Sequence, residues 1–374
     1  MALDHVRLFL TAAQFDPLAV GDTTPAYFAT RWITHLCAPG FFFLAGLSAD
    51  LAGLSADLAG RRMGSRAEVT RFLASRGVLL MLLEIVVFGL AWSFNPGWWW
   101  FGVIWGLGAS LLVLAVLIHL PRPVLLAAGG FLALFHQVLA DALPAHSGNL
   151  SALLFTGGMT AAPIIGSRLV LYPLLPWLAL MILGYGLAPW LAPKGQPRAD
   201  RFALAGAAGL TGFVACRLLG LGDPAPSFPA PDDWTTGLMV FLNVEKYPPS
   251  PAFAMVTLGT LALIVSVAAL TEGRKGQRFL AALALFGRVP MFFYSLHLFL
   301  IHGLAVAFAV ALGWPSGYLV WRSEGPNISP PDGYGLGLPG IYAAWALVML
   351  ILTPACAAFG RFKHTRTDAW LRYL

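Results

Sequence analysis

The sequence predicts an all-α protein, a polytopic bundle of about nine transmembrane helices. Of its 374 residues, 58% are hydrophobic and only 11% are charged, whereas a soluble domain carries about 25% charged residues. The apolar residues are gathered in long runs, and a helix that crosses a bilayer needs about 20 of them. The net charge of +6 is explained by its placement between these runs, so it does not indicate a nucleic-acid partner.

Nine apolar runs are long enough, or nearly so, to cross a membrane. They lie at 33–58, 78–94, 101–120, 124–143, 172–192, 202–221, 253–270, 289–312 and 340–360. The runs 78–94 and 253–270 are marginal in length. Trp98, Trp99 and Trp100 lie between the second and third runs and are typical of a membrane interface. Tyr172-Pro173 opens the fifth run, and the stiff Pro248-Pro249 pair leads into the seventh.

Basic residues predict the orientation of the helices. If the connection after the first run is cytoplasmic, only six of the 23 Lys and Arg residues lie on the other side, as the positive-inside rule requires. Those six are Arg7, Arg31, Arg168, Arg217, Lys246 and Arg322. The N-terminus and the long connections 144–171, 222–252 and 313–339 are then extracytoplasmic, and the C-terminus is cytoplasmic.

We expect one domain over residues 1–374, in which 1–31 form an extracytoplasmic N-terminal segment. No cleavable signal peptide is visible. An extracytoplasmic N-terminus without a signal suggests that the chain begins near the outer end of a first helix that is itself missing. The alternative is a genuine nine-span protein whose N-terminal tail translocates alone.

A perfect tandem repeat of seven residues occupies Leu44 to Gly60, LAGLSADLAGLSADLAG. One heptad lengthens a helix by about 10 Å and nearly preserves its face, so Asp50 and Asp57 share one side. We expect the second copy to protrude into the cytoplasm, and a neutral duplication is the default explanation.

The three cysteines predict neither a disulfide framework nor a metal site. Cys37, Cys216 and Cys356 lie in apolar runs and lack the paired spacing of zinc or redox motifs.

Polar residues gather at the same end of several spans, which favours a reaction or transport centre. In TRWITHLCAPGFFFLAG (Thr30 to Gly46), Arg31 and His35 run into an apolar segment. An ionisable group there costs about 2.5–3.5 kcal/mol at mid-span and usually marks a site. His297 and His302 are five residues apart, so they do not share a helix face, and His297 lies deeper. A lone intramembrane histidine is more often a packing group, but here several lie beside arginines and carboxylates.

Two further segments carry candidate polar residues. FHQVLAD contains His136 and Asp141, whose spacing is a weak signal for an oriented base. The outer connection 222–252 contains Asp223 and, in FLNVEKYPPS, the cation Lys246. Lys246 could pair locally with Asp223 or hold an anionic substrate.

Together these motifs resemble the bacterial membrane proteins of the heparan-α-glucosaminide N-acetyltransferase-like family, within the transmembrane acyltransferase superfamily. The resemblance rests on ALDHVR (Ala2 to Arg7), TRWITHLCAPGFFFLAG, YPLLPWLALMILGYG (Tyr172 to Gly186), GDP (Gly222 to Pro224), FLNVEKYPPS with TLG (Thr257 to Gly259), and FGRVPMFFYSLHLFLIH (Phe286 to His302). It implies a multi-pass protein of the bacterial inner membrane that moves an acetyl group from acetyl-CoA to a sugar amine or hydroxyl. The family also has a span ahead of the ALDHVR-like stretch.

For that reaction, we rank His35 or His297, then His5, as the general base, because a histidine near neutral pKa suits proton transfer. Asp4 would orient a histidine, and Arg31, Lys246 or a tyrosine would stabilise the oxyanion. An acetyl-histidine intermediate and direct transfer both remain open. The residues expected to bind the substrate are Asn243, Lys246, Tyr247, Asp223, His136 and Asp141.

Arg288 and Arg278 are candidates for binding the CoA phosphates. The positive-inside rule alone would also explain two arginines at these positions. Expected partners are membrane lipid and a small-molecule or glycan acceptor, and a homodimer is compatible with the sequence. The rival functions are a multi-span transporter or flippase and a non-catalytic membrane protein that keeps the fold.

Overall fold

The computed structural model describes residues 1–58, 66–95, 100–143, 148–162, 166–223, 233–271, 277–320, 330–366, 368 and 371. Within these ranges, eight helices are long and apolar enough to cross a membrane. They are Pro25–Leu51, Arg66–Ser93, Arg122–Asp141, Leu174–Leu191, Ala199–Leu219, Pro251–Thr271, Pro290–Leu312 and Leu338–Thr365. Each overlaps one of the predicted runs, which confirms the all-α polytopic fold.

The run predicted over 101–120 forms a shorter helix than expected. Helix α6 (Val103–Leu117) has 15 residues, so it is about 22 Å long, whereas the hydrocarbon core of a bilayer is about 30 Å thick. It starts after Gly102, and the chain turns at Ile118 to Leu120 before the next helix.

Residues cluster by their contacts into two compact units. One comprises Met1–Thr34, Val86–Trp99 and Thr271–Leu374, and the other comprises His35–Ile85 and Trp100–Leu270. The expectation of a single domain over 1–374 stays a prediction.

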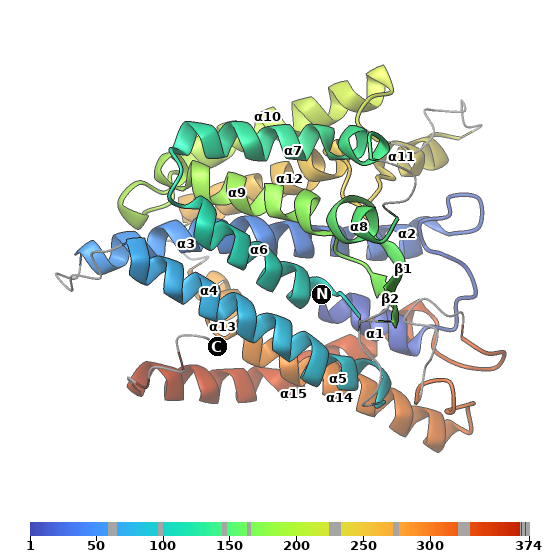
Figure 1. Cartoon of the computed structure of the whole chain (residues 1–374). Helices are drawn as coiled ribbons and strands as arrows, with labels where there is room; N and C mark the ends of the chain where they lie inside the picture. The colour runs from blue at the N-terminus through green and yellow to red at the C-terminus, as the bar shows by residue number, and fades with distance from the viewer. Residues whose placement is uncertain are drawn as a thin grey trace. The chain divides into compact units, whose positions relative to one another are not determined.

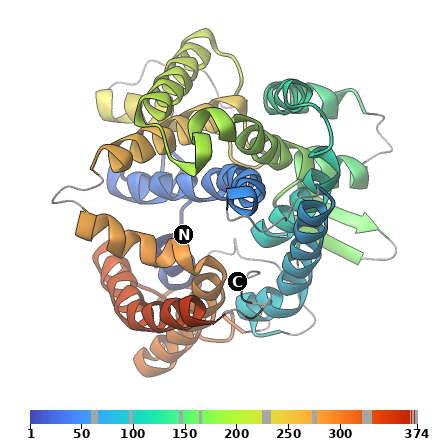
Figure 2. The ribbon, with the colours of Figure 1, turned by 90° about the vertical axis from the view of Figure 1, so that its left-hand side faces the viewer.

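In the first unit, a short N-terminal helix packs against two long helices. The helices of this unit are α1 (Ala2–Leu10), α2 (Pro25–Ile33), α5 (Gly89–Ser93), α13 (Gln277–Arg288), α14 (Pro290–Leu312) and α15 (Leu338–Thr365). α1 contacts both α14 and α15, which lie side by side (Figures 1 and 2). Val6, Phe9 and Leu10 are buried because they form the apolar face of α1.

His302 holds three segments of this unit together. Its ring is buried, with Nδ1 2.8 Å from the carbonyl oxygen of Ala91 and Nε2 2.9 Å from that of Leu319. Carbonyl oxygens only accept, so both ring nitrogens must donate for both hydrogen bonds to form. The ring stacks on Phe94 at 3.8 Å and on Phe9 at 4.6 Å between centroids. His302 is therefore an anchor for α14, α5 and the connection after α14.

The second unit surrounds the buried helix α9 (Leu174–Leu191), which contacts α3, α6 and α7. Its other elements are α3 (Cys37–Leu58), α4 (Arg66–Leu83), α6, α7 (Arg122–Asp141), α8 (Gly148–Ser151), β1 (Gly158–Ala162), β2 (Gly166–Val170), α10 (Ala199–Leu219), α11 (Trp234–Leu242) and α12 (Pro251–Thr271). The strands β1 and β2 form an antiparallel hairpin, with Gly158 opposite Val170, next to α8 (Figure 1). α3 runs through the tandem repeat to Leu58. The side chains of residues 52–58 and all of residues 59–65 lie outside the described residues. The predicted protrusion of the second repeat copy into the cytoplasm therefore also lies outside them.

Helices α3 and α9 approach each other through two glycines. A Cβ added at Gly46 would overlap the carbonyl oxygen of Met181, and one added at Gly184 would overlap that of Phe43. Small residues allow such backbone contact, which replaces the hydrophobic driving force that is absent between helices in lipid.

Glu84 joins α4 to the start of α6. It begins a π-helical turn (Glu84–Phe88) that continues α4. Its buried carboxylate accepts hydrogen bonds through Oε2 from the backbone N–H groups of Ile104, at 2.9 Å, and Trp105, at 3.0 Å. These N–H groups lie in the first turn of α6, where no intrahelical acceptor exists. Glu84 was not among the residues predicted from the sequence, although a carboxylate within an apolar run is itself a signal.

We expect Gly184→Ala to lower the melting temperature of the detergent-purified protein strongly, because the new methyl group pushes α9 away from α3. Gly130→Ala is the matched control. Gly130 lies within α7, and a Cβ there meets nothing within 4 Å, so this change should be neutral or stabilise by up to about 1 kcal/mol. Equal melting temperatures for the two variants would contradict the close α3–α9 contact.

We expect Glu84→Ala to destabilise the protein by about 1–3 kcal/mol or more, because two buried N–H groups lose their acceptor. Glu84→Gln keeps an oxygen that can accept both hydrogen bonds and should lose much less. Thermal unfolding of the two variants measures the difference, and a Gln variant as unstable as the Ala variant would argue against the capping role.

Candidate functional site

The predicted site residues divide between the two units. Asp4, His5, Arg31, Arg288 and His297 belong to the first. The second contains His35, His136, Asp141, Asp223, Asn243, Lys246 and Tyr247. The side chain of Arg278 lies outside the described residues.

The first unit brings His5 and His297 into direct contact. Nδ1 of His5, on α1, lies 2.7 Å from Nε2 of His297, on α14, and the rings are nearly parallel with centroids 4.9 Å apart. Trp92 meets the His5 ring edge-on at 5.0 Å, and Phe293 stacks parallel to His297 at 5.1 Å. His297 is completely buried. Two histidines that are 292 residues apart in the chain thus form one pair with aromatic walls.

The hydrogen bonds of this pair assign its neutral tautomers. Nδ1 of His297 lies 3.0 Å from the carbonyl oxygen of Phe293, which can only accept, so this nitrogen carries the hydrogen. In neutral His297, Nε2 is then the acceptor and receives the N–H of His5 Nδ1. Neutral His5 consequently carries its lone pair on Nε2. In this arrangement each imidazole of the pair has one donor and one acceptor nitrogen.

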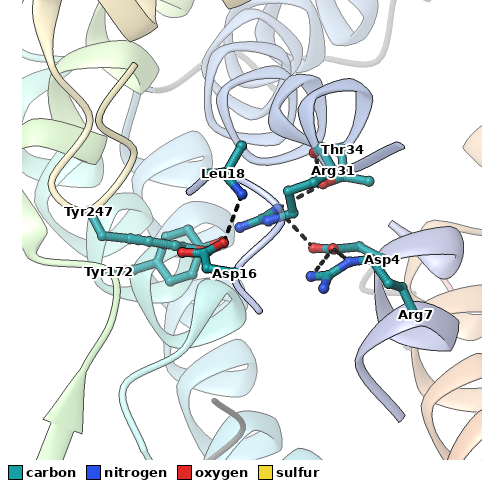
Figure 3. A network of polar contacts seen from close by, with 8 residues as sticks. All are labelled: Asp4, Arg7, Asp16, Leu18, Arg31, Thr34, Tyr172 and Tyr247. Atoms are coloured by element: carbon teal, nitrogen blue, oxygen red, sulfur yellow. Dashed lines mark hydrogen bonds and ion pairs between the residues drawn. The ribbon is translucent and has the colours of Figure 1, made fainter. Parts of the chain in front are cut away.

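Asp4, which directly precedes His5 in the sequence, connects two arginines. Its carboxylate accepts hydrogen bonds from Arg7 at 3.0 Å and Arg31 at 3.1 Å, and Arg31 also donates to the hydroxyl of Thr34 at 2.8 Å (Figure 3). The carboxylate is 21% exposed and the two arginine side chains 11% and 13%. Ion pairs that are largely withdrawn from solvent are well oriented, so α1 and α2 are held together at the start of the chain. The orienting role expected for Asp4 toward a histidine stays a prediction.

In the second unit, Asp223 organises the turn before α12. Its carboxylate accepts hydrogen bonds from the backbone N–H of Glu245 at 3.1 Å and from the hydroxyl of Ser250 at 2.7 Å. Lys246 is buried, with Nζ 4.8 Å from the centre of the Tyr247 ring, a cation–π contact.

Tyr247 continues this cluster toward the start of α9. Its hydroxyl lies 3.4 Å from that of Tyr172, and the two rings meet edge-on (Figure 3). Asn243 ends α11 just before the turn. One polar corner of the second unit therefore contains four residues that were selected or quoted separately from the sequence: Asp223, Lys246, Tyr247 and Tyr172.

The other predicted residues of the second unit do not lie in this turn. His35 is buried, with its ring edge-on to Phe253 at 5.4 Å. His136 is buried on α7, where Nδ1 lies 3.1 Å from the carbonyl oxygen of Leu132, one helical turn earlier. Asp141 is the exposed last residue of the same helix.

Arg288, proposed from the sequence for the CoA phosphates, is an exposed residue at the end of α13. Its carbonyl oxygen lies 3.4 Å from Nζ of Lys363. Among the residues that the structure describes, no group of three or more His, Cys, Asp or Glu side chains could hold a metal ion.

Arg66 and Arg122 are among the 17 Lys and Arg residues that the positive-inside rule assigns to the cytoplasmic side. Arg122, at the start of α7, forms an ion pair with Asp50 of α3, and both Arg66 and Arg122 line a cavity in the second unit. Asp50 near the end of an apolar run was the signal that could have identified the pair, since a carboxylate there needs a cation.

Comparison with known proteins supports the resemblance found in the motifs. The sequence profile of a family described as heparan-alpha-glucosaminide N-acetyltransferase, catalytic, matches residues 5–220. This range includes His5, Arg31 and His35 and stops before the turn around Lys246. No curated protein and no solved structure matches the chain. The profile match covers more than half of the chain, so this multi-pass membrane protein belongs to the heparan-α-glucosaminide N-acetyltransferase catalytic family, which supports a general N-acetyltransferase role.

Proposed function

We propose that the protein transfers an acetyl group from acetyl-CoA to an amine or hydroxyl of a sugar on the extracytoplasmic side of a bacterial inner membrane. The observation that carries the proposal is the hydrogen-bonded pair of His5 and His297. Acyl transfer to an amine needs a base that is neutral at physiological pH and positioned to take a proton, and an imidazole meets both conditions.

In the proposed reaction, the acceptor nitrogen or oxygen attacks the thioester carbonyl carbon and loses its proton to Nε2 of His5. As His5 becomes cationic, its Nδ1–H bond to His297 strengthens, because a charged donor makes a stronger hydrogen bond. The C–S bond then breaks, the amide or ester forms, and the proton returns to the departing thiolate to give free CoA. The tautomers favour His5 as the base and His297 as its support, which reverses the order suggested by the sequence.

Arg31 is proposed to stabilise the oxyanion, since Asp4 and Thr34 already fix its guanidinium. Sugar binding is proposed, as a separate inference, for the corner of the second unit that contains Asp223, Asn243, Lys246 and Tyr247. Its ammonium, hydroxyl and carboxylate groups offer the mixed hydrogen bonds that a sugar needs.

We expect His5→Ala to lower the rate of acetyl transfer to an α-glucosaminide test acceptor by about 10²–10⁴-fold, as removal of a general base does. His297→Ala should lower the rate less and change the pH–rate profile, because it leaves His5 without its acceptor. His364→Ala, which removes an exposed histidine from the end of α15, is the control. If His5→Ala folds normally and keeps its rate and profile, His5 is not the base.

We expect Lys246→Met to raise KM for the acceptor about tenfold or more with a smaller effect on kcat, because it removes a binding charge and keeps the length of the side chain. Lys194→Met, in the exposed connection after α9, should leave both constants unchanged. An unchanged KM in a Lys246→Met protein of normal melting temperature would assign Lys246 a purely structural role.

A further inference from the structure

A cavity of about 390 Å³ opens at one end of the second unit. Its lining residues are Arg66, Ile118, His119, Leu120, Pro121, Arg122 and Tyr185. They come from the start of α4, the connection between α6 and α7, the start of α7 and the second half of α9. Known small-molecule sites have volumes of about 300–1,000 Å³, so the cavity has the size of a ligand site.

One of its two guanidinium groups is held rigidly in place. Arg122 forms an ion pair with Asp50, and its Nη1 donates to the carbonyl oxygen of Tyr185 at 3.1 Å. The guanidinium also lies 5.1 Å from the centre of the Tyr185 ring. Its side chain is still 42% exposed, so solvent and ligands can reach part of it.

The other guanidinium, that of Arg66, adds a second positive charge to the cavity. Within the described part of the chain, Arg66 forms no ion pair, and its side chain is exposed. His119 lies between the helices, with Nε2 2.9 Å from the hydroxyl of Thr70. Because Asp50 offsets only Arg122, the cavity carries a net positive charge beside an apolar wall of Ile118, Leu120 and Pro121.

This combination selects for a particular ligand chemistry. Planar guanidinium groups bind phosphate oxygens in pairs, and an imidazole adds a further donor. Neither a sugar nor an apolar molecule would use the unbalanced charge of Arg66.

We propose that this cavity binds a phosphate-bearing ligand through Arg66, His119 and Arg122. The phosphates come either from CoA, in which case the site rests on the proposed function, or from the headgroup of an anionic phospholipid. Arg66 and Arg122 lie on the side that the positive-inside rule makes cytoplasmic, where both sources are found. If CoA is the source, this cavity, rather than Arg288 and Arg278, is the proposed site of its phosphates.

Binding to the full-length protein tests the proposal. CoA and inorganic pyrophosphate are titrated into detergent-purified protein, and phosphatidylglycerol retention is measured by native mass spectrometry against phosphatidylcholine. Arg66→Gln removes the unbalanced charge and leaves the Arg122–Asp50 pair intact. Arg71→Gln, an equally exposed position of α4 outside the cavity, is the matched control.

We expect Arg66→Gln to weaken the binding of one phosphate ligand about tenfold or more, while Arg71→Gln binds as the unsubstituted protein does. A loss confined to CoA and pyrophosphate identifies the nucleotide source, and a loss confined to phosphatidylglycerol identifies the lipid source. Unchanged binding of all probes by Arg66→Gln overturns the cavity proposal.

The two proposals fail in different ways. If the unsubstituted protein binds CoA and Arg66→Gln binds it equally well, the acetyl-CoA function stands and the cavity is not its phosphate site. If the unsubstituted protein does not bind CoA but Arg66→Gln loses phosphatidylglycerol, the cavity proposal stands and the acetyl-CoA function fails.

Discussion

The interior of a membrane contains no water, so each polar group within a span must find its partner inside the protein. The carboxylate of Glu84 meets this constraint with two N–H groups at the start of α6. His302 meets it with two carbonyl oxygens, and Asp50 meets it with Arg122. Each solution connects segments that are distant in the chain. The polar groups therefore determine which helices are neighbours as well as where chemistry can occur.

Two histidines on one helix illustrate how surroundings assign a role. His297 and His302 are separated by five residues of α14, about 140° around the helix, and both are buried. His302 faces two acceptors and is sandwiched between two phenylalanines, an arrangement that immobilises it. His297 faces one acceptor and a second imidazole, so it retains an acceptor nitrogen of its own. Only the second arrangement leaves a ring nitrogen that accepts a hydrogen bond.

Helix α9 links the two polar ends of the second unit. Tyr172, just before its start, contacts Tyr247 and so the turn that holds Lys246. Tyr185, in its second half, lines the basic cavity with Arg122. The 13 positions between the two tyrosines correspond to about 20 Å of helix. In the proposed reaction, α9 would separate the corner around Lys246 from the basic cavity.

The sequence alone determined the membrane class, the positions of the helices and their orientation signal. Long apolar runs have few alternatives in a bilayer, where only helices and closed barrels satisfy the backbone. The eight long helices each overlap a predicted run, although the second begins at Arg66, twelve residues before its run. The same sequence selected His5, His297, Lys246 and Tyr247, because ionisable and aromatic groups beside apolar runs are conspicuous.

Tertiary structure decided which of these residues meet. The pairing of His5 with His297 joins α1 to α14 across most of the chain, and no spacing rule relates positions so far apart. The tautomers depend on the carbonyl oxygen of Phe293, which lies beside Nδ1 of His297 only once α14 is folded. The basic cavity could not be predicted from the sequence. Arg66, His119 and Arg122 come from three helix ends, and these meet only through the packing of α4, α6, α7 and α9.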